Sequence, residues 1–116
     1  MADELDVYRR QDMGARIGLD VASAVVVVDF VRGFADPEQV SDGNIGQAIA
    51  RTAGLLAQAH GWPVAHTCVV YAEDGSDAGA LTLKATGLPK LTETSLLSQI
   101  LPDIAPTPGE LVIRKR

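Results

Sequence analysis

The sequence has little of what marks a secreted, membrane-bound or nucleic-acid-binding protein. Its single cysteine, Cys68, excludes an internal disulfide framework. Ten Lys and Arg stand against 15 Asp and Glu, and a net charge of −5 gives no reason to expect nucleic acid as a partner. Apolar runs such as Ala24–Val28 are too short to cross a bilayer, and the acidic start lacks the order of a signal peptide. We therefore expect a cytoplasmic protein with no membrane partner.

The composition is that of a globular domain. Hydrophobic residues make up 47% of the 116 residues, and a chain of this length forms at most one domain with its own core. The continuous β-branched run Ala24–Asp29 is typical of a strand buried on both faces of a parallel sheet. Apolar residues at helical spacing predict a helix from about Asn44 to His60, because Gly61 and Pro63 follow as a stop signal.

Other segments of helix, strand and loop character alternate with these two. In chain order they are a helix at about Leu5–Arg16, a loop at Arg32–Pro37, a strand at Pro63–Tyr71, a polar loop at Glu73–Gly79, short helices near Ala80–Thr86 and Ser95–Leu101, and a strand at Glu110–Arg114. This alternation predicts an α/β protein with a doubly wound, parallel, Rossmann-like sheet. Three buried strands leave an apolar edge unpaired, so we expect the sheet to be incomplete on this chain. A second polypeptide, a continuation of the chain or a symmetry mate would cover it.

Two charged residues lie where open α/β sheets build their sites, outside the carboxyl ends of the strands. Asp29 follows the Val25–Val28 run, and Lys115 follows Leu111–Ile113. On these local patterns alone, Asp29 could merely cap the following turn. Lys115 could be a solvated strand-end lysine, and its neighbours Arg114 and Arg116 blur the assignment.

Three stretches in order resemble the isochorismatase-like cysteine hydrolases. Val25–Phe34 resembles the first-strand motif of that family. His66–Gly79 is similar to the second strand and loop of its N-carbamoylsarcosine amidase and maleamate amidase branch, and Pro106–Lys115 resembles that branch's approach to its catalytic lysine. The likeness runs from about Tyr8 to the last residue.

The resemblance implies a Cys-Asp-Lys amidohydrolase that needs no cofactor. In that family the first-strand aspartate, here Asp29, takes the thiol proton. The lysine, here Lys115, keeps the site electrostatically poised while the thiol attacks a small linear amide or carbamoyl carbon and ammonia leaves. A nearby cation favours a thiolate, so these roles are physically coherent. The resemblance also implies a thioester-type intermediate, which water hydrolyses.

By the family pattern, the nucleophilic cysteine and the oxyanion amides lie beyond Lys115. We therefore expect residues 1–116 to be the N-terminal part of one hydrolase domain, with 1–20 a helical arm and 21–116 the first three βα units. A companion polypeptide or a missing C-terminal part would carry the cysteine, and the complete enzyme would be a homo-oligomer. The alternatives are a non-catalytic isochorismatase-like binding module and an unrelated flavodoxin-like domain.

Several further residues are candidates for substrate binding, catalysis or metal binding. Phe34 and Tyr71 are predicted to contact the substrate, although each could instead belong to the core. Cys68 sits within an apolar strand, where a buried and unreactive thiol is the commoner role. His66, with His60, shows no zinc-ligand spacing, and the zinc motif of nicotinamidase relatives is absent. The acidic residues of the 73–79 loop are expected to be solvated, so we predict no metal.

Overall fold

The computed structural model describes residues 4–12, 16, 18, 22–35, 44–59 and 61–116. Three strands form one parallel sheet: β1 (Val25–Val28), β2 (Val64–Val69) and β3 (Leu111–Lys115). Their order is β1–β2–β3, so β2 is central and the two outer strands each have one partner in the described chain. The predicted parallel α/β architecture is confirmed.

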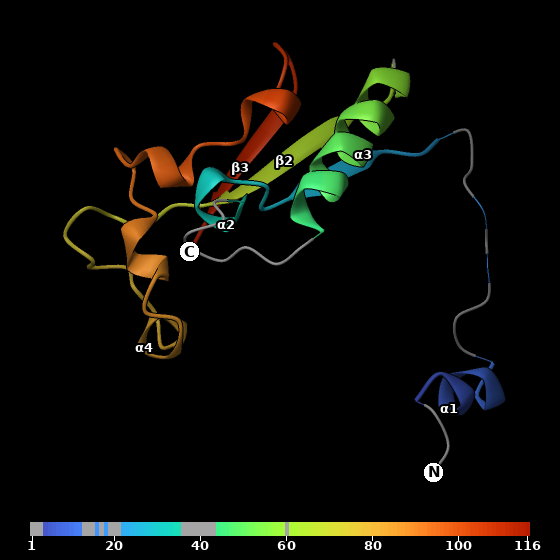
Figure 1. Cartoon of the computed structure of the whole chain (residues 1–116), viewed down its shortest axis with the longest axis horizontal. Helices are drawn as coiled ribbons and strands as arrows, with labels where there is room; N and C mark the ends of the chain where they lie inside the picture. Colours follow the sequence, from blue (N-terminus) through green and yellow to red (C-terminus); the bar gives the residue numbers. More distant parts are fainter. Residues whose placement is uncertain (1–3, 13–15, 17, 19–21, 36–43, 60) are drawn as a thin grey trace.

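Helices connect and flank these strands (Figure 1). They are α1 (Glu4–Arg10), α2 (Arg32–Ala35), α3 (Ile45–Gln58) and α4 (Leu81–Lys84), with 3₁₀ turns η1 (Leu88–Lys90), η2 (Leu96–Ser98) and η3 (Pro102–Ile104). Helix α3 runs beside the sheet in Figure 1, whereas α1 stands apart from it. Within the described residues, no helix has the length and apolar character that a membrane crossing requires.

Strand register sorts the side chains onto two faces of the sheet, because register-paired residues of neighbouring strands point the same way. Two rows share one face, which we call the site face: Val26–Ala65–Leu111 and Val28–Thr67–Ile113. The row Val27–His66–Val112 lies on the opposite face. These rows determine which polar side chains can meet at the ends of the strands.

The hydrophobic side chains of the site face are largely exposed among the described residues. Val26 is 60% exposed and Val28 57%, whereas Val27 on the opposite face is 4% exposed. Leu111 and Ile113 on β3 are also exposed. The prediction that β1 is buried on both faces is therefore wrong for the described residues, because no described element packs over the site face.

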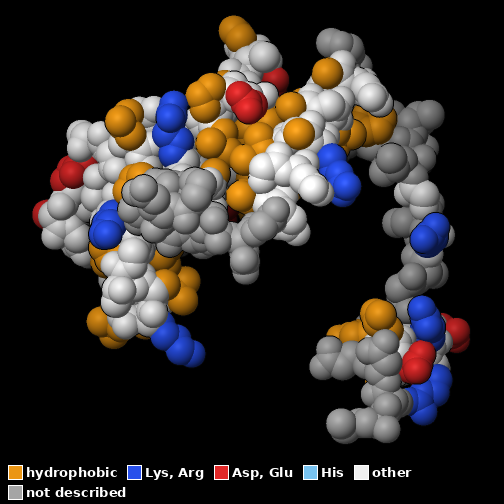
Figure 2. Space-filling view, in the orientation of Figure 1, with side chains coloured by type: hydrophobic (Ala, Val, Ile, Leu, Met, Phe, Trp, Pro, Cys, Tyr) orange, Lys and Arg blue, Asp and Glu red, His pale blue; other side chains and the backbone are white. Residues whose placement is uncertain are grey.

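The main core lies around the carboxyl end of β2. Val31, Cys68, Val70, Tyr71 and Leu91 are buried there, with Val69 beside them. Hydrophobic side chains also reach the surface around α3 and α4 (Figure 2), and Leu55, Leu81 and Leu83 are among the exposed ones.

Two predicted helices differ from those observed. The N-terminal helix ends at Arg10 rather than near Arg16, and Asp12 has a positive φ of 54° that a helix does not accommodate. The segment predicted as a helix at Ser95–Leu101 holds only the short turn η2. Pro102 was expected to end that helix but instead opens η3, since proline fits the first turn of a helix.

The Arg32–Pro37 segment was predicted to be a loop, but its first four residues form the single helical turn α2. Tertiary packing decides this difference, because α2 lies against η2 and Phe34 packs on the core. Gly33 allows the Leu91 side chain to lie close to the backbone of α2, because a Cβ at position 33 would be 2.6 Å from a Leu91 methyl carbon. Asp36 and Pro37 lie outside the described residues.

The remaining predicted boundaries agree within about two residues. Helix α3 ends at Gln58, where the Ala59 N–H closes the last turn on the Leu55 and Leu56 carbonyl oxygens. His60, the predicted last residue of this helix, lies outside the described residues. Strand β3 begins after Glu110 and includes Lys115 as its last residue.

Candidate active site

Asp29 lies immediately after β1 in an unusual backbone conformation. Its φ is 61°, in the left-handed region that few side chains adopt but that Asp tolerates better than most. Its N–H donates to the Thr67 carbonyl oxygen at 3.0 Å, and its own carbonyl oxygen accepts from the Val31 N–H at 2.8 Å. The sharp bend aims the carboxylate across the sheet instead of along β1.

Both oxygens of the Asp29 carboxylate have partners from other strands. The Thr67 hydroxyl on β2 donates to Oδ1 at 2.9 Å, and the Lys115 ammonium on β3 pairs with Oδ2 at 2.8 Å. The Asp29 side chain is 22% exposed and that of Lys115 is 47% exposed. Each of the three strands thus contributes one group to a cluster at the carboxyl edge of the sheet.

Thr67 carries no sequence pattern that marks it as a site residue. The signal that could have found it is register, because Thr67 pairs with Val28, the residue before Asp29. That register cannot be read from the sequence of either strand alone. A threonine within an apolar strand is also ordinary, since β-branched residues favour strands.

The structure distinguishes Lys115 from the two arginines beside it. Arg114 pairs in register with Cys68 and so points to the face opposite the ion pair. Arg116 donates to the Val70 carbonyl oxygen and pairs with Asp77, which also accepts the Ala72 N–H at 2.9 Å. Within the described residues, Lys115 is therefore the cation that meets Asp29.

Cys68 lies in the core and not in a reactive setting. It is 4% exposed, and its thiol is 3.8 Å from the Ile113 carbonyl oxygen. Burial raises its pKa, the nearby Asp29 charge raises it further, and Arg114 only partly opposes them. A raised pKa keeps a thiol protonated, the opposite of what a nucleophilic cysteine needs.

The structure does not bring the two predicted substrate-contacting residues into the Asp29–Lys115 cluster. Tyr71 is 4% exposed, belongs to the core, and donates its backbone N–H to the Leu91 carbonyl oxygen at 2.7 Å. Phe34 is partly buried against the same core. Contact of either residue with a substrate stays a prediction.

Two carboxylates of the acidic loop after β2 accept hydrogen bonds from other residues of the chain. Glu73 accepts from the Thr94 N–H and hydroxyl, and Asp74 from the Ser76 N–H, and these hydrogen bonds lower the pKa of both carboxyls. Among the residues that the structure describes, no group of three His, Cys, Asp or Glu side chains is placed to hold a metal ion.

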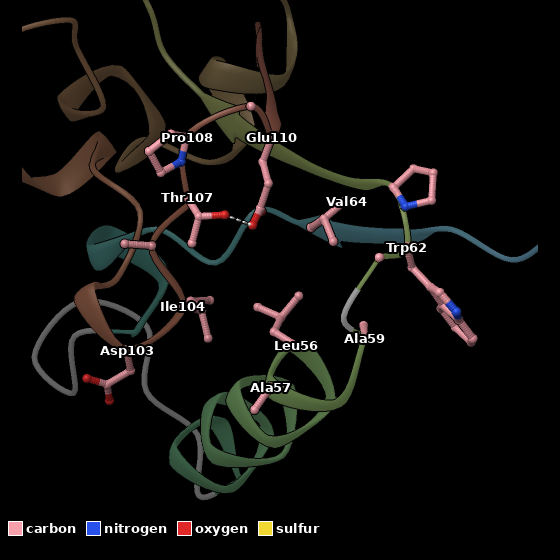
Figure 3. A pocket seen from close by; sticks show the side chains of 14 residues that line it. Leu56, Ala57, Ala59, Trp62, Val64, Asp103, Ile104, Thr107, Pro108 and Glu110 are labelled. Atoms are coloured by element: carbon pink, nitrogen blue, oxygen red, sulfur yellow. Dashed lines mark hydrogen bonds between the residues drawn. The ribbon is translucent and has the colours of Figure 1, made fainter.

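A cleft of about 570 Å³ lies at the amino ends of β2 and β3, at the other end of the sheet from the Asp29–Lys115 cluster. In Figure 3, Leu56 of α3 and Ile104 of η3 line it, and the side chain of Glu110, the residue before β3, extends into it. Glu110 accepts from the Thr107 hydroxyl and lies 2.8 Å from Nε2 of the buried His66. Open α/β sheets build their sites at the carboxyl ends of the strands. The Asp29–Lys115 cluster is therefore a better candidate for the active site than this cleft, although its side chains are partly exposed.

Comparison with known proteins gives a consistent pattern. The model of the isochorismatase domain family matches residues 23–116. Over 107 residues, the chain is 31% identical to the maleamate amidohydrolase of Pseudomonas putida, covering 89% of this chain and 50% of that protein. The chain thus spans about half the length of the curated relative it matches.

Solved structures show the same fold. An isochorismatase family protein from Desulfovibrio vulgaris superposes with a TM-score of 0.66 at 29% identity, over 79% of this chain and 51% of its own. The N-carbamoylsarcosine amidase of Thermoplasma acidophilum superposes with a TM-score of 0.59 at 21% identity, over 79% of this chain and 50% of its own.

Proposed function

This chain belongs to the isochorismatase domain family, whose matched relatives include hydrolases, and we propose that it supplies the base and the lysine of a cysteine amidohydrolase. The observation that carries the proposal is the 2.8 Å contact between Lys115 Nζ and Asp29 Oδ2 at the carboxyl edge of the sheet. A carboxylate can act as a general base, and an ammonium beside it supplies the cation that favours a thiolate. The pair can therefore activate a thiol brought next to it.

The proposed reaction has two stages. Asp29 takes the proton of a cysteine thiol, and the Lys115 ammonium stabilises the resulting thiolate. The sulfur attacks the amide or carbamoyl carbon, the carbon–nitrogen bond breaks, and the nitrogen leaves as ammonia after receiving the proton from Asp29. Water then gives a proton to Asp29 and its hydroxide attacks the thioester. The acid product departs, and the Asp29 proton returns to the sulfur.

The nucleophilic cysteine is proposed to come from outside residues 1–116. The buried setting of Cys68 and the half-length match to the maleamate amidohydrolase both support this. We propose that residues 1–116 are the N-terminal part of one hydrolase domain, with 1–20 an arm and 21–116 the first three βα units. The remaining part, on the same or a companion polypeptide, would cover the site face and complete the sheet. The resemblance further supports a homo-oligomer of the complete enzyme.

The proposed substrate class is a small linear amide or carbamoyl compound, similar to maleamate or N-carbamoylsarcosine. The named relatives support this class, and the sequence likeness of His66–Gly79 to that branch agrees with it. Phe34 lies in α2, which follows Asp29 closely in the chain, and Tyr71 lies just beyond the end of β2, so both remain proposed wall residues of the pocket. Each would act from the core by setting the shape of that wall.

The test is ammonia release by the complete protein that contains this chain. Maleamate and N-carbamoylsarcosine would be supplied separately, with nicotinamide, whose amide is carried on an aromatic ring, for comparison. We expect ammonia from at least one linear compound, and loss of activity after iodoacetamide alkylates the nucleophile. Mass spectrometry of the denatured, substrate-treated protein should find the acyl group on a cysteine other than Cys68. A folded protein that releases no ammonia from any linear amide or carbamoyl compound would overturn the proposal and favour the binding module.

A further inference from the structure

Thr67 makes two separate contacts to Asp29 from the central strand. Its hydroxyl donates to Oδ1 at 2.9 Å, and its carbonyl oxygen accepts the Asp29 N–H at 3.0 Å. One residue of β2 therefore holds both the backbone and the carboxylate of the proposed base. We infer that Thr67 is a positioning residue that sets the orientation of Asp29 for proton transfer, an inference that rests on the proposed function.

The orientation of the carboxylate needs such a support. Asp29 sits after the end of β1 with a left-handed φ of 61°, outside the ladder that restrains a strand residue. The torsion that turns its carboxylate plane is broad and has no strong intrinsic preference. Lys115 alone fixes it poorly, because a lysine side chain is long and this one is 47% exposed.

Thr67 is the more rigid of the two partners. It lies in β2, which is paired with β1 on one side and β3 on the other, and its side chain is β-branched and therefore restricted about χ1. A donor on Oδ1 from β2 and a second on Oδ2 from β3 together define the plane of the carboxylate. A carboxylate has about four lone-pair sites, so two remain for the thiol proton.

Removing this hydroxyl without changing shape gives a direct test in the complete enzyme. Thr67→Val keeps the branched side chain and loses the donor, whereas Thr67→Ser keeps the donor. We expect Thr67→Val to lower kcat by about 10- to 100-fold, because small displacements of a catalytic group have effects of that order. KM should stay within about twofold, because Thr67 acts on the base and not on substrate binding. Thr67→Ser should recover most of the lost rate.

A double-mutant cycle shows whether Thr67 acts through Asp29. If it does, Thr67→Val should not lower kcat any further in an enzyme that already carries Asp29→Asn. A matched control is Thr52→Val on α3, whose hydroxyl donates to the Ala48 carbonyl oxygen at 2.8 Å within the helix and not to Asp29; it should leave kcat unchanged.

Three results would overturn the positioning role. They are a wild-type kcat in Thr67→Val, an equal loss in Thr67→Ser, and a full additional loss in the Asp29→Asn background. Each leaves the proposed function intact as long as Asp29→Asn itself lowers kcat by about 10²–10⁴ and leaves a measurable residual rate. A near-normal rate in Asp29→Asn would instead refute the proposed function, so the two failures are distinguishable.

Discussion

Asp29→Asn is the sharpest perturbation of the proposed mechanism, because it changes charge with little change in shape. Asn tolerates the left-handed φ of 61° about as well as Asp does. Its carbonyl oxygen can still accept the Thr67 hydroxyl, which is 2.9 Å from Oδ1 in the native chain. What is lost is the negative charge that pairs with Lys115 and the site that accepts a proton.

Asp29→Asn should have a small effect on stability and a large effect on the reaction rate. The Asp29–Lys115 pair is partly exposed, at 22% and 47%, so breaking it should cost about 0.2–1 kcal/mol of unfolding free energy. That corresponds to a melting temperature lower by about 0.4–4 °C in a domain of roughly 200 residues. Loss of a general base should lower kcat by about 10²–10⁴. The variant should therefore be folded and nearly inactive.

Ammonia release by the complete enzyme measures the rate, and a thermal melt measures the stability. Asp77→Asn is the matched control, since Asp77 is also ion-paired and its side chain is 27% exposed, but its partner is Arg116. We expect Asp77→Asn to keep kcat within a few-fold of wild type. A near-normal rate in Asp29→Asn, or an equal loss in both variants, would refute the assignment of Asp29 as the base.

Three further predictions concern the lysine, the site face and acid stability. Lys115→Ala should slow alkylation of the nucleophilic cysteine by iodoacetamide at neutral pH, because the cation that favours the thiolate is lost; an unchanged rate would make Lys115 a surface charge. Ile113→Thr should lower the unfolding free energy of the complete protein, measured in urea, by about 1–2 kcal/mol, because the proposed remaining part covers this 44% exposed side chain. Val7→Thr, at an exposed position on α1, is the control and should lower it by under about 0.5 kcal/mol. Equally small losses in both variants would mean that the site face stays open. Hydrogen bonds from Thr107, then from His66, lower the pKa of Glu110 from its ordinary 4.5, so their stabilisation is present above about pH 4.5 and lost as pH falls through the lowered pKa. The stability that Thr107→Ala loses relative to wild type should thus be largest at pH 7 and shrink as the pH falls through the lowered pKa of Glu110, and a loss that does not change with pH would contradict this.

The sequence by itself determined the α/β alternation and the two residues at the ends of β1 and β3. Apolar β-branched runs such as Val25–Val28 and the helical spacing of α3 are local signals, so each element could be recognised from its own residues. The positions of Asp29 and Lys115 at strand ends followed from those runs. Because open α/β sheets build their sites outside the carboxyl ends of the strands, both residues could be predicted as site residues.

Only the tertiary structure decided which groups meet at that edge. Lys115 rather than Arg114 or Arg116 pairs with Asp29, and Thr67 joins them. Both outcomes depend on strand register, because a shift of one residue moves every side chain of a strand to the other face. Register is set by pairing between segments more than 30 residues apart in the chain, as between Val28 and Thr67. The turn α2 likewise forms through its packing against η2, a contact that its own four residues do not encode.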